Sequence, residues 1–533
     1  MAEPEGYTYF PSLTISVTRN TSSANIRGRS MERFVASVAA VLLCSCATVP
    51  PPRPAAEALP APAPQAAPAK LVEWPDAVVY FVVLDRFADG DKANNADADI
   101  TAKGTFHGGD LTGLTQQLDE IASLGATALW ITPVVDNIDS FVTGAGFPDW
   151  GYHGYWADDF TKLDPRFGTE AQLKTLVDEA HRRGIRVLLD VVYNHAGYNS
   201  RYLRDAKTKR WLRSNEIGDC GQDDITSCVA GLPDFKTELQ EVRDYLYDAH
   251  LSLAKRVGLD GFRLDTVKHV THDFWREHRQ RVDAQLSPGF FLLGEVWGGD
   301  AQSLDPWFAG DEMDAGFDFS FQGSTLGWLQ GRGRTVAFDR YLKQREKVRS
   351  GYLLSHFLSS HDVRGALNIL EGDKDLFRLA ALLQFTSAGL PMIYYGEEVG
   401  RPGGDWPDNR SDMPWGSRAI APGAGKPRDE ALRDDYEKLI AIRKAHPALS
   451  RGVHTAISTQ GDLLVFSQKH ENDEVIIAVN RGVADAETSV PVPTQWTGGT
   501  ITDAWNGEPV SVKDGAITML LKGKGARIIT WRE

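Results

Sequence analysis

Residues 261–265 place an arginine and a carboxylate two positions apart in a short apolar segment, Gly-Phe-Arg-Leu-Asp. Side chains two apart on a β-strand point to the same side, so Arg263 and Asp265 can face one site. The guanidinium would hold the carboxylate ionised, and an ionised, oriented carboxylate can act as a nucleophile. Taken alone, the segment is equally compatible with a structural ion pair near a strand end.

Two further acids end or follow apolar segments of the same kind. Glu295 ends the segment 290–295, and Asp362 comes shortly after the segment 353–359. Three histidines also follow such segments: His195, His269 and His361. One acid at a strand end is usually a cap or an ion pair. Three acids accompanied by an arginine and several histidines favour an active site.

The elements that must position these side chains alternate between strand-like and helix-like segments. Apolar strands fit residues 78–83, 128–131, 186–192, 261–265, 290–295, 353–359 and 392–395, and helices fit 114–124, 171–183 and 238–256. Such alternation predicts an α/β fold with a parallel sheet, most simply an eight-stranded (β/α)8 TIM barrel. Barrel enzymes carry their chemistry at the C-terminal ends of the strands, where these acids lie.

The alternation is interrupted once and then replaced by another pattern. Residues 71–195 and 237–447 form the predicted barrel, and the polar, Gly-rich residues 196–236 predict a short inserted domain after strand 3. Residues 448–533 contain short alternating strands and predict a C-terminal all-β sandwich domain. Cys220 and Cys228 lie in the insertion, and in an oxidising compartment they could form a disulfide.

Residues 1–46 are predicted to consist of upstream residues followed by an export signal of the lipoprotein type. Met31-Glu32-Arg33 precedes a short apolar segment, 34–44, which is too short to span a bilayer. Leu43-Cys44-Ser45-Cys46 resembles a bacterial lipoprotein box in which Cys46 carries the lipid, with an ordinary cleaved signal as the alternative. We expect translation to begin at Met31. Residues 47–70 are rich in Pro and Ala and predict an extended linker.

Charge and composition restrict the partners of the chain. A net charge of −15 disfavours nucleic acid and anionic membrane surfaces, and it suits a neutral substrate and bound cations. Fourteen Trp, 15 Tyr and 23 Phe residues leave aromatic surface for stacking. We therefore expect an exported monomer that touches the outer membrane only through its N-terminal lipid anchor, on the periplasmic side or at the cell surface.

Four segments together resemble the conserved regions of glycoside hydrolase family 13, the α-amylase family. They are Asp190–His195, Gly261–His269, Gly294–Trp297 and Phe357–Asp362. The resemblance implies that Asp265 is the nucleophile, Glu295 the general acid and base, and Asp362 a stabiliser of the transition state. The chemistry agrees, because acetal cleavage with retention needs two carboxylates about 5–5.5 Å apart.

The resemblance also implies a set of substrate-binding residues: Tyr155, His153, His195, Arg263, Lys268, His269, His361 and Arg410. Tyr155 would stack on the sugar whose bond is cleaved, and Arg263 would orient Asp265. The family often has an acid four residues before the arginine that corresponds to Arg410. This chain has Trp406 there, although Asp405 or Asp408 could substitute.

Two calcium sites follow from the resemblance. The ligands of the first would be Asp89, Asp91, Asn94, Asn95, Asp110 and the carbonyl of Gly108, and those of the second Asn194, Asp234 and the carbonyl of His269. Hard oxygen ligands suit Ca²⁺. A solvated Asx-rich turn is the alternative for the first set. Phe235-Lys236 departs from the family's usual Leu-Asn beside the second set.

The sequence therefore predicts a calcium-dependent, retaining, endo-acting hydrolase of α-1,4 bonds in starch, glycogen or maltooligosaccharides, which is an α-amylase. Alternatives within the family are a transglycosylase, such as a cyclodextrin glucanotransferase or a 4-α-glucanotransferase, and a maltogenic amylase or neopullulanase. A more remote alternative is a relative that binds glycans without catalysis. That alternative requires loss of the nucleophile or the acid, whereas Asp265, Glu295 and Asp362 are all present.

Overall fold

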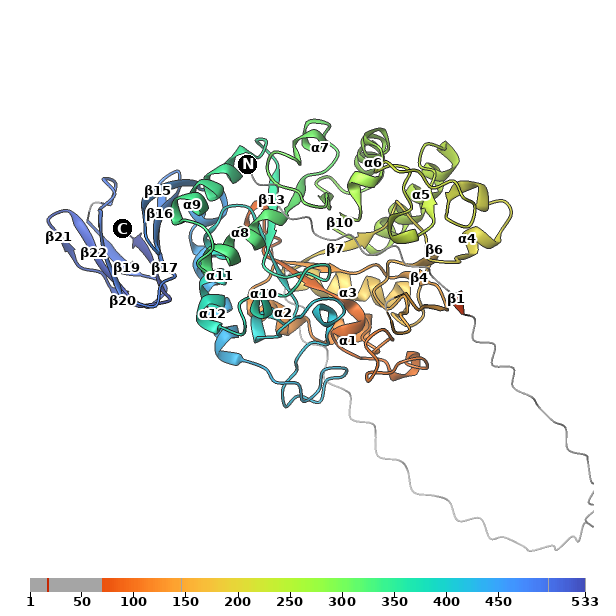
Figure 1. Cartoon of the computed structure of the whole chain (residues 1–533), viewed down its shortest axis with the longest axis horizontal. Helices are drawn as coiled ribbons and strands as arrows, with labels where there is room; N and C mark the ends of the chain where they lie inside the picture. The colour runs from red at the N-terminus through yellow and green to blue at the C-terminus, as the bar shows by residue number, and fades with distance from the viewer. Residues whose placement is uncertain (1–16, 19–69, 145, 497, 533) are drawn as a thin grey trace, which may run out of the picture. The chain divides into compact units, whose positions relative to one another are not determined.

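The computed structural model of the chain describes residues 17–18, 70–144, 146–496 and 498–532 (Figure 1). The predicted signal and linker, including the proposed lipid-bearing Cys46, lie outside the described residues apart from β1 (Val17–Thr18). Within the described ranges, no helix has both the length and the apolar character that crossing a bilayer requires.

Eight parallel strands close into a barrel, which confirms the predicted fold class. The order around the barrel is β10-β11-β12-β13-β14-β2-β3-β7. The strands are β2 (Val79–Val82), β3 (Ala128–Ile131), β7 (Arg186–Val191), β10 (Gly261–Leu264), β11 (Phe291–Gly294), β12 (Ala315–Asp318), β13 (Leu353–Phe357) and β14 (Leu390–Tyr394). Most of these residues are buried, and continuous apolar segments are typical of parallel strands covered on both faces.

Helices follow the strands and surround the barrel (Figure 1). They are α1 (Leu111–Gln116), α2 (Leu118–Leu124), α3 (Glu170–Arg182), α5 (Gln240–Val257), α6 (His272–Gln285), α7 (Asp305–Ala309), α8 (Phe319–Leu329), α9 (Thr335–Gln344), α10 (Ala366–Ile369), α11 (Lys374–Thr386), α12 (Glu430–Ala445) and α13 (Ala448–Arg451). Local sequence fixes their ends. A capping box of Thr169 and Gln172 begins α3, and Gly258 in the left-handed conformation ends α5.

Two extensions interrupt the barrel at the ends of β3 and β7. The first contains β4 (Val135–Asn137), β5 (Phe141–Val142) and β6 (Ala157–Leu163); β4 pairs with β6, and β5 pairs with β1. The second is the predicted insertion, with α4 (Arg201–Arg204), β8 (Leu212–Arg213) and β9 (Asp234–Phe235). Both extensions approach the rim on which the candidate residues lie.

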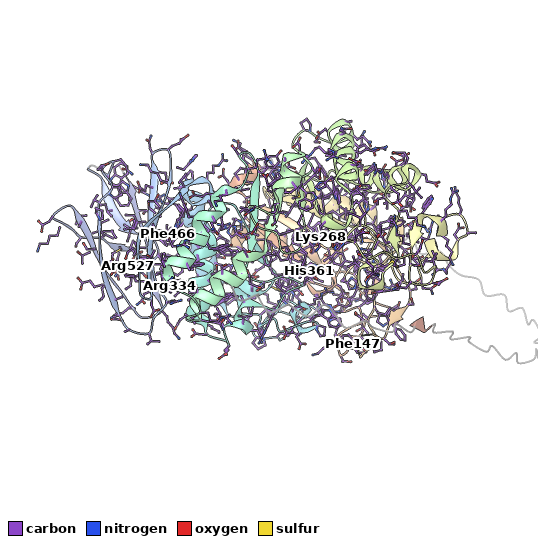
Figure 2. All side chains as sticks on the ribbon, turned by 45° about the horizontal axis from the view of Figure 1, so that its top comes forward. Phe147, Lys268, Arg334, His361, Phe466 and Arg527 are labelled. Atoms are coloured by element: carbon purple, nitrogen blue, oxygen red, sulfur yellow. A yellow bond between two sulfur atoms is a disulfide. The ribbon has the colours of Figure 1, made fainter. Side chains whose placement is uncertain are left out.

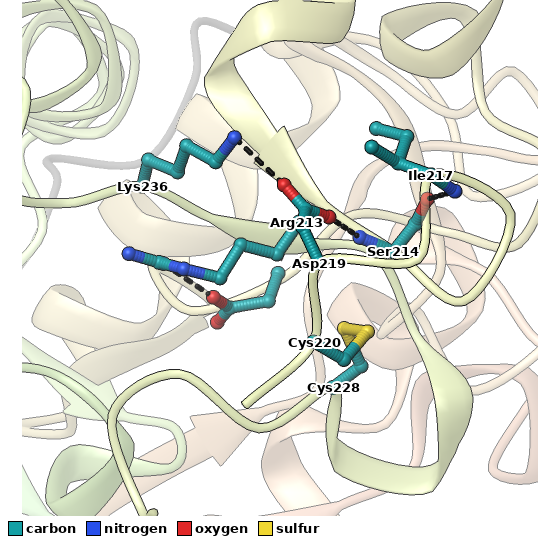
Figure 3. Close-up of a disulfide and its surroundings, with 8 residues drawn as sticks. Arg213, Ser214, Ile217, Asp219, Cys220, Cys228 and Lys236 are labelled. Carbon is teal, nitrogen blue, oxygen red and sulfur yellow. Dashed lines mark hydrogen bonds and ion pairs between the residues drawn. A yellow bond between two sulfur atoms is a disulfide. The ribbon is translucent and has the colours of Figure 1, made fainter. Parts of the chain in front are cut away.

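A disulfide joins Cys220 and Cys228 inside the insertion (Figure 3). The neighbouring Asp219 accepts a hydrogen bond from the backbone N–H of Ser214 at 3.0 Å and pairs with Lys236 Nζ at 2.9 Å. These contacts tie the disulfide loop to both sides of the β8–β9 ribbon. The insertion therefore has internal order although it is short.

The C-terminal part forms two antiparallel sheets. One contains β15 (Val453–Gln460), β16 (Leu463–His470), β17 (Asp473–Asn480), β23 (Gly525–Arg532), β19 (Thr500–Asp503) and β20 (Glu508–Pro509), and the other β18 (Ala486–Pro491), β22 (Ala516–Leu521) and β21 (Val512–Lys513). Val465, Ile476 and Ile529 of the first sheet pack with Val490 and Ile517 of the second. The arrangement is the sandwich expected from the alternating pattern.

Candidate active site

Four charged side chains from three neighbouring strands meet at the C-terminal end of the barrel. Asp190 belongs to β7 and Arg263 to β10, and the two residues lie opposite each other in the strand register. Asp265 and Glu295 directly follow β10 and β11. All four residues are buried, with at most 6% of any of them exposed. Parallel pairing of the strands thus brings residues far apart in sequence onto one rim.

Arg263 is the centre of this cluster. Its Nη1 donates to Asp190 Oδ1 at 3.0 Å and to Asp265 Oδ1 at 2.6 Å, and its Nη2 lies 3.0 Å from Glu295 Oε1. The guanidinium also lies over the ring of Trp130, 5.2 Å from the centroid. One buried cation therefore orients three carboxylates, and its charge-assisted hydrogen bonds fix their positions.

Glu295 has the electrostatic character of an acid that holds its proton at neutral pH. Burial, opposed by the charge of Arg263 and reinforced by those of Asp265 and Asp362, raises the pKa of Glu295 to about 8. The second carboxylate oxygen accepts a hydrogen bond from the backbone N–H of Thr266 at 2.9 Å. Glu295 is therefore suited to donate a proton to a leaving group.

Asp362 lies at the same rim in a different environment. His361 Nε2 lies 3.1 Å from one of its oxygens, and Arg410 Nη2 donates to the other at 3.0 Å. Partial desolvation by the surrounding rim favours the neutral form, but His361, Arg410 and Arg263 together lower the pKa of Asp362 below its usual value. Asp362 stays ionised where Glu295 holds its proton, so the two acids can have different roles.

Aromatic side chains form one wall of the site. Tyr155 donates a hydrogen bond from its hydroxyl to Asp190 at 2.7 Å, and its ring stacks on His361 with centroids 5.4 Å apart. His153 is buried beside it and accepts a hydrogen bond from the Tyr155 backbone N–H at 3.1 Å. Burial lowers the pKa of His361 to about 3 and that of His153 well below its usual value. Both rings are therefore neutral at physiological pH.

The remaining predicted substrate-binding residues lie where β7 and β10 end. His195 is buried, and its Nε2 has no hydrogen-bond partner among the described residues. Lys268 and His269 belong to the 3-10 helix η6 (Val267–His269), and His269 Nδ1 lies 2.7 Å from the carbonyl oxygen of Asp224 in the disulfide loop. All eight predicted substrate-binding residues thus lie on the rim or on the segments that follow its strands.

Two residues of the site, Asp190 and Thr266, were not among the sequence-based candidates. Asp190 connects Arg263, Tyr155 and Trp130, and burial raises its pKa to about 7. Thr266 has the positive φ of 49°, which directs its N–H to Glu295. An aspartate within an apolar strand was the available signal for Asp190, whereas no sequence signal marks the conformation of Thr266.

The first candidate cation site brings its six residues together. Asp110 accepts hydrogen bonds from the Asp91 backbone at 2.8 Å and from Asn94 Nδ2 at 3.3 Å, and Asn95 Nδ2 donates to Asp89 Oδ2 at 2.8 Å. The other side-chain oxygens of Asp89, Asn94 and Asn95 are buried without a partner. A Cβ on Gly108 would lie 2.7 Å from Asn95 Oδ1, so glycine leaves room at this position. Converging oxygens without donors fit a hard cation.

The second candidate site also converges, but it already contains an arginine. The side-chain amide of Asn194 lies close to the His269 carbonyl and to Asp234 Oδ1. In the orientation that places its nitrogen on this side, the amide donates to both oxygens at 3.1 Å. With the amide oxygen turned toward them, three oxygens would face one another. Arg213 Nη1 donates to Asp234 Oδ2 at 2.8 Å and neutralises part of the negative charge.

The family model of the α-amylase catalytic domain matches residues 81–219 and 225–434. Neopullulanase 2 of Thermoactinomyces vulgaris is 31% identical over 476 residues, which cover 84% of this chain and 77% of that protein. A cyclomaltodextrinase of a Bacillus species is 31% identical over 436 residues, with 77% and 73% covered.

The crystal structure of an Anoxybacillus α-amylase superposes with a TM-score of 0.76 at 30% identity and covers 86% of this chain and 98% of that one. The matched residues include all three acids of the rim. The barrel, the rim and these matches lead to one conclusion: the chain belongs to the α-amylase family, glycoside hydrolase family 13, and is a glycoside hydrolase that acts on α-glucans.

Proposed function

We propose that the protein hydrolyses α-1,4 bonds in short maltooligosaccharides, linear or cyclic, with retention at the anomeric carbon. The names of the two relatives, a neopullulanase and a cyclomaltodextrinase, support this alternative better than the endo-acting α-amylase favoured by the sequence. Long starch chains would then be poorer substrates than maltoheptaose or a cyclodextrin.

The observation that carries the proposal is that Asp265 and Glu295 bind two nitrogens of the same guanidinium, at 2.6 and 3.0 Å. One guanidinium is small, so the two carboxylates lie close together. A short separation is typical of retaining enzymes, whereas inverting enzymes leave room for a water molecule between the sugar and the base.

In the first step, Asp265 attacks the anomeric carbon while Glu295 protonates the leaving glycosidic oxygen. The bond between the two sugars breaks, and a covalent glycosyl-enzyme forms on Asp265. In the second step, Glu295 takes a proton from water, whose oxygen attacks the anomeric carbon and releases Asp265. The raised pKa of Glu295 suits the first step, because the acid must carry its proton before the bond breaks.

The other rim residues would bind and distort the sugar. Asp362 would bind hydroxyls of the glucose unit being cleaved, and neutral His195 and His361 would donate or accept further hydrogen bonds. The Tyr155 ring would stack on this unit, with His153 beside it. Lys268 and His269 would contact the leaving group, and Arg410 would hold Asp362.

A transglycosylase remains the second candidate, because it forms the same glycosyl-enzyme and differs only in the nucleophile of the second step. The test is product analysis on maltoheptaose, β-cyclodextrin and soluble starch. Faster cleavage of the first two, with short linear products only, is expected. Products longer than maltoheptaose would identify a transferase, and preferential cleavage of starch would restore the α-amylase assignment. Binding without products would indicate the non-catalytic alternative.

We further propose that Ca²⁺ binds the first oxygen-rich loop, with Asp89, Asp91, Asn94, Asn95, Asp110 and the Gly108 carbonyl as ligands. The three buried oxygens without partners support this proposal. The ion would supply structural cross-linking of the loop after β2, not chemistry at the rim. A second ion would bind Asn194, Asp234 and the carbonyl of His269. It would stabilise the fold less than the first, because Arg213 already pairs with Asp234.

Export through a lipoprotein signal, with lipid on Cys46, completes the proposal. The support is the apolar segment 34–44 and the cysteine that follows it. Metabolic labelling with a fatty-acid analogue tests it: label is expected in the wild type and lost in Cys46→Ser. Size-exclusion chromatography tests the expected monomer. Label retained in Cys46→Ser would refute the anchor.

A further inference from the structure

Asn409 is a buried side chain that the mechanism above does not use. It is 1% exposed and belongs to the 3-10 helix η9 (Asp408–Arg410), in the loop that follows β14. The next residue, Arg410, binds Asp362 at the rim. The groups that the Asn409 side chain binds connect it to the same acid.

The side-chain amide of Asn409 donates to two carbonyls, one on each side of Asp362. Its Nδ2 lies 2.8 Å from the carbonyl oxygen of His361 and 3.2 Å from that of Val363. His361, which is labelled in Figure 2, precedes Asp362 in the chain, and Val363 follows it. One amide group therefore holds the backbone on both sides of the carboxylate.

The amide oxygen of Asn409 gains nothing from this arrangement. Oδ1 is buried and has no hydrogen-bond partner among the described residues. A buried polar atom without a partner is unfavourable. The two carbonyls can only accept, so Nδ2 must face them and Oδ1 must face away. The side chain is therefore used for its two donors, while its acceptor stays unpaired.

Arg410 binds the same carbonyl and continues to the carboxylate. Its Nε donates to the His361 carbonyl oxygen at 2.9 Å, and its Nη2 donates to Asp362 Oδ1 at 3.0 Å. A carbonyl oxygen has two lone pairs, so it can accept from Asn409 and Arg410 together. Arg410 thus fixes the carboxylate of Asp362, and Asn409 fixes the backbone that carries it.

Asn409 is itself anchored to the barrel. Its carbonyl oxygen accepts hydrogen bonds from the Tyr394 hydroxyl at 2.9 Å and from Arg401 Nη1 at 2.8 Å. Tyr394 is the last residue of β14. Arg401 is 6% exposed, and its guanidinium lies over the Tyr394 ring, 4.5 Å from the centroid. The amide of Asn409 is therefore held by a barrel strand, which makes it a rigid support.

The ends of the loop that carries Asp362 are held by a different side chain. Gln322 of α8 donates from Nε2 to the carbonyl of Leu358 at 2.7 Å and to that of Arg364 at 2.9 Å. These two carbonyls lie at the beginning and near the end of the loop between β13 and α10. The loop is thus closed by Gln322, and Asn409 acts in its middle, where the acid lies.

We propose that Asn409 is a positioning residue of the reaction, which fixes the backbone on both sides of Asp362 and thereby the orientation of this carboxylate toward the sugar. The inference rests on the hydrolase activity proposed above and on the role of Asp362 in it. A displacement of about 1 Å at a reacting centre can lower the rate on the order of 100-fold. Loss of the amide should therefore slow the reaction through Asp362.

The test uses Asn409→Leu, which approximately keeps the size of the side chain and removes both donors, and Asn409→Ala. Each is assayed well below its own Tm on α-maltosyl fluoride and maltoheptaose. We expect kcat and kcat/KM to fall about tenfold or more in both variants, while KM changes less than about threefold. This pattern is typical of the loss of an interaction made only in the transition state. An unchanged kcat in both variants would refute the proposal.

A double-mutant cycle with Asp362→Asn distinguishes positioning from a general effect on the protein. If Asn409 acts through Asp362, Asn409→Leu should lower kcat/KM less than about threefold in the Asp362→Asn background. α-Maltosyl fluoride is the substrate for this cycle, because its reactive leaving group keeps slow variants measurable. The same factor in both backgrounds would mean that the two residues act independently, and it would overturn the assignment.

Asn480→Leu is the matched control. Asn480 is 2% exposed at the end of β17 in the sandwich, and its Nδ2 donates to the carbonyl of Ala484 at 2.8 Å and to that of Lys522 at 3.1 Å. The variant loses the same kind of paired hydrogen bonds, so Tm should fall while kcat and KM stay those of the wild type. A comparable loss of kcat in Asn480→Leu would assign the effect of Asn409 to lost stability. Wild-type protein that cleaves neither maltosyl fluoride nor maltoheptaose would refute the proposed function itself, before any variant is considered.

Discussion

Arg263 Nη2 lies 3.0 Å from Glu295 Oε1, and yet burial raises the pKa of Glu295 to about 8. The ion pair alone would favour an ionised glutamate, so desolvation and the nearby acids prevail over the guanidinium. The same guanidinium binds Asp265 at 2.6 Å. One arginine therefore serves an acid that needs its proton and an acid that needs its charge.

This balance predicts the alkaline side of the pH profile. The general acid acts in its protonated form, so kcat/KM for maltooligosaccharides should fall as the pH rises through about 8. The measurement is kcat/KM between pH 5 and 10. With α-maltosyl fluoride, whose leaving group needs no proton, Glu295→Gln should retain most of its kcat/KM and show no alkaline decline, whereas its kcat should fall because the variant lacks the base of the second step. A decline that persists in the variant would assign it to another group.

The nucleophile is tested by a change that preserves shape. Asp265→Asn should lower kcat on the order of 10⁴-fold or more, because no glycosyl-enzyme can form. Titration calorimetry should still detect maltoheptaose binding. Asp178→Asn serves as the control, because Asp178 is more than half exposed on α3 and pairs with Lys174 at 2.9 Å. Activity close to that of the wild type in Asp265→Asn would exclude Asp265 as the nucleophile.

The calcium proposal predicts a coupling between the ion and stability. Removal of Ca²⁺ with a chelator should lower Tm by several degrees, and added Ca²⁺ should restore it, because an ion that binds only the folded state stabilises it by mass action. Asp89→Ala should lower the starting Tm and remove the response. A wild-type Tm that is indifferent to chelator would remove the argument for the ion.

The disulfide predicts an effect on both folding and substrate binding. The double variant Cys220→Ser/Cys228→Ser should lose about 2–3 kcal/mol of stability, because the unfolded chain gains conformational entropy when the disulfide no longer closes this loop. The loop also places the Asp224 carbonyl 2.7 Å from His269, so KM should rise while kcat changes little. Urea unfolding and steady-state kinetics measure the two effects. An unchanged KM would separate the loop from the substrate.

Glu397, a buried acid outside the active site, predicts a change in stability that depends on pH. Glu397 follows β14, is 3% exposed, and neither carboxylate oxygen has a hydrogen-bond partner among the described residues. Burial raises its pKa to about 8 from the ordinary 4.5, so the unfolded chain releases this proton between pH 4.5 and 8 before the folded protein does. The loss of folding stability caused by the raised pKa of Glu397 is therefore absent below pH 4.5 and grows as the pH rises.

Glu397→Gln should therefore stabilise the protein by about 1–2 kcal/mol at pH 8 and leave it nearly unchanged at pH 4.5. Urea unfolding at the two pH values measures this difference. Glu398→Gln is the comparison, because Glu398 accepts a hydrogen bond from Tyr80 at 2.8 Å and should gain less. Equal effects at both pH values would show that the proton is not responsible.

The sequence was sufficient for most of the barrel because parallel strands buried on both faces read as apolar segments, as Val79–Val82 and Arg186–Val191 do. β12 was missed, since Ala-Gly-Phe-Asp is short and contains a single large apolar residue. The extension after β3 was also missed, because its strands have only two to seven residues and mixed burial.

The residues of the candidate site were likewise predictable from the sequence only in part. Asp265, Glu295 and Asp362 were found because they occupy recognisable positions after strands. Thr266 was not found, because its positive φ of 49° and the contact of its N–H with Glu295 depend on how the segments after β10 and β11 meet. No spacing within one segment predicts a contact between two.

Tyr155 is fixed at two points before any sugar arrives, by its hydroxyl on Asp190 and by its ring on His361. Its rotational freedom was lost when the protein folded, so a sugar that stacks on it restricts almost no further motion. Stacking at this position should thus carry only a small penalty in side-chain entropy. The barrel thereby separates the ordering of the active site, which happens once per molecule, from turnover, which happens many times.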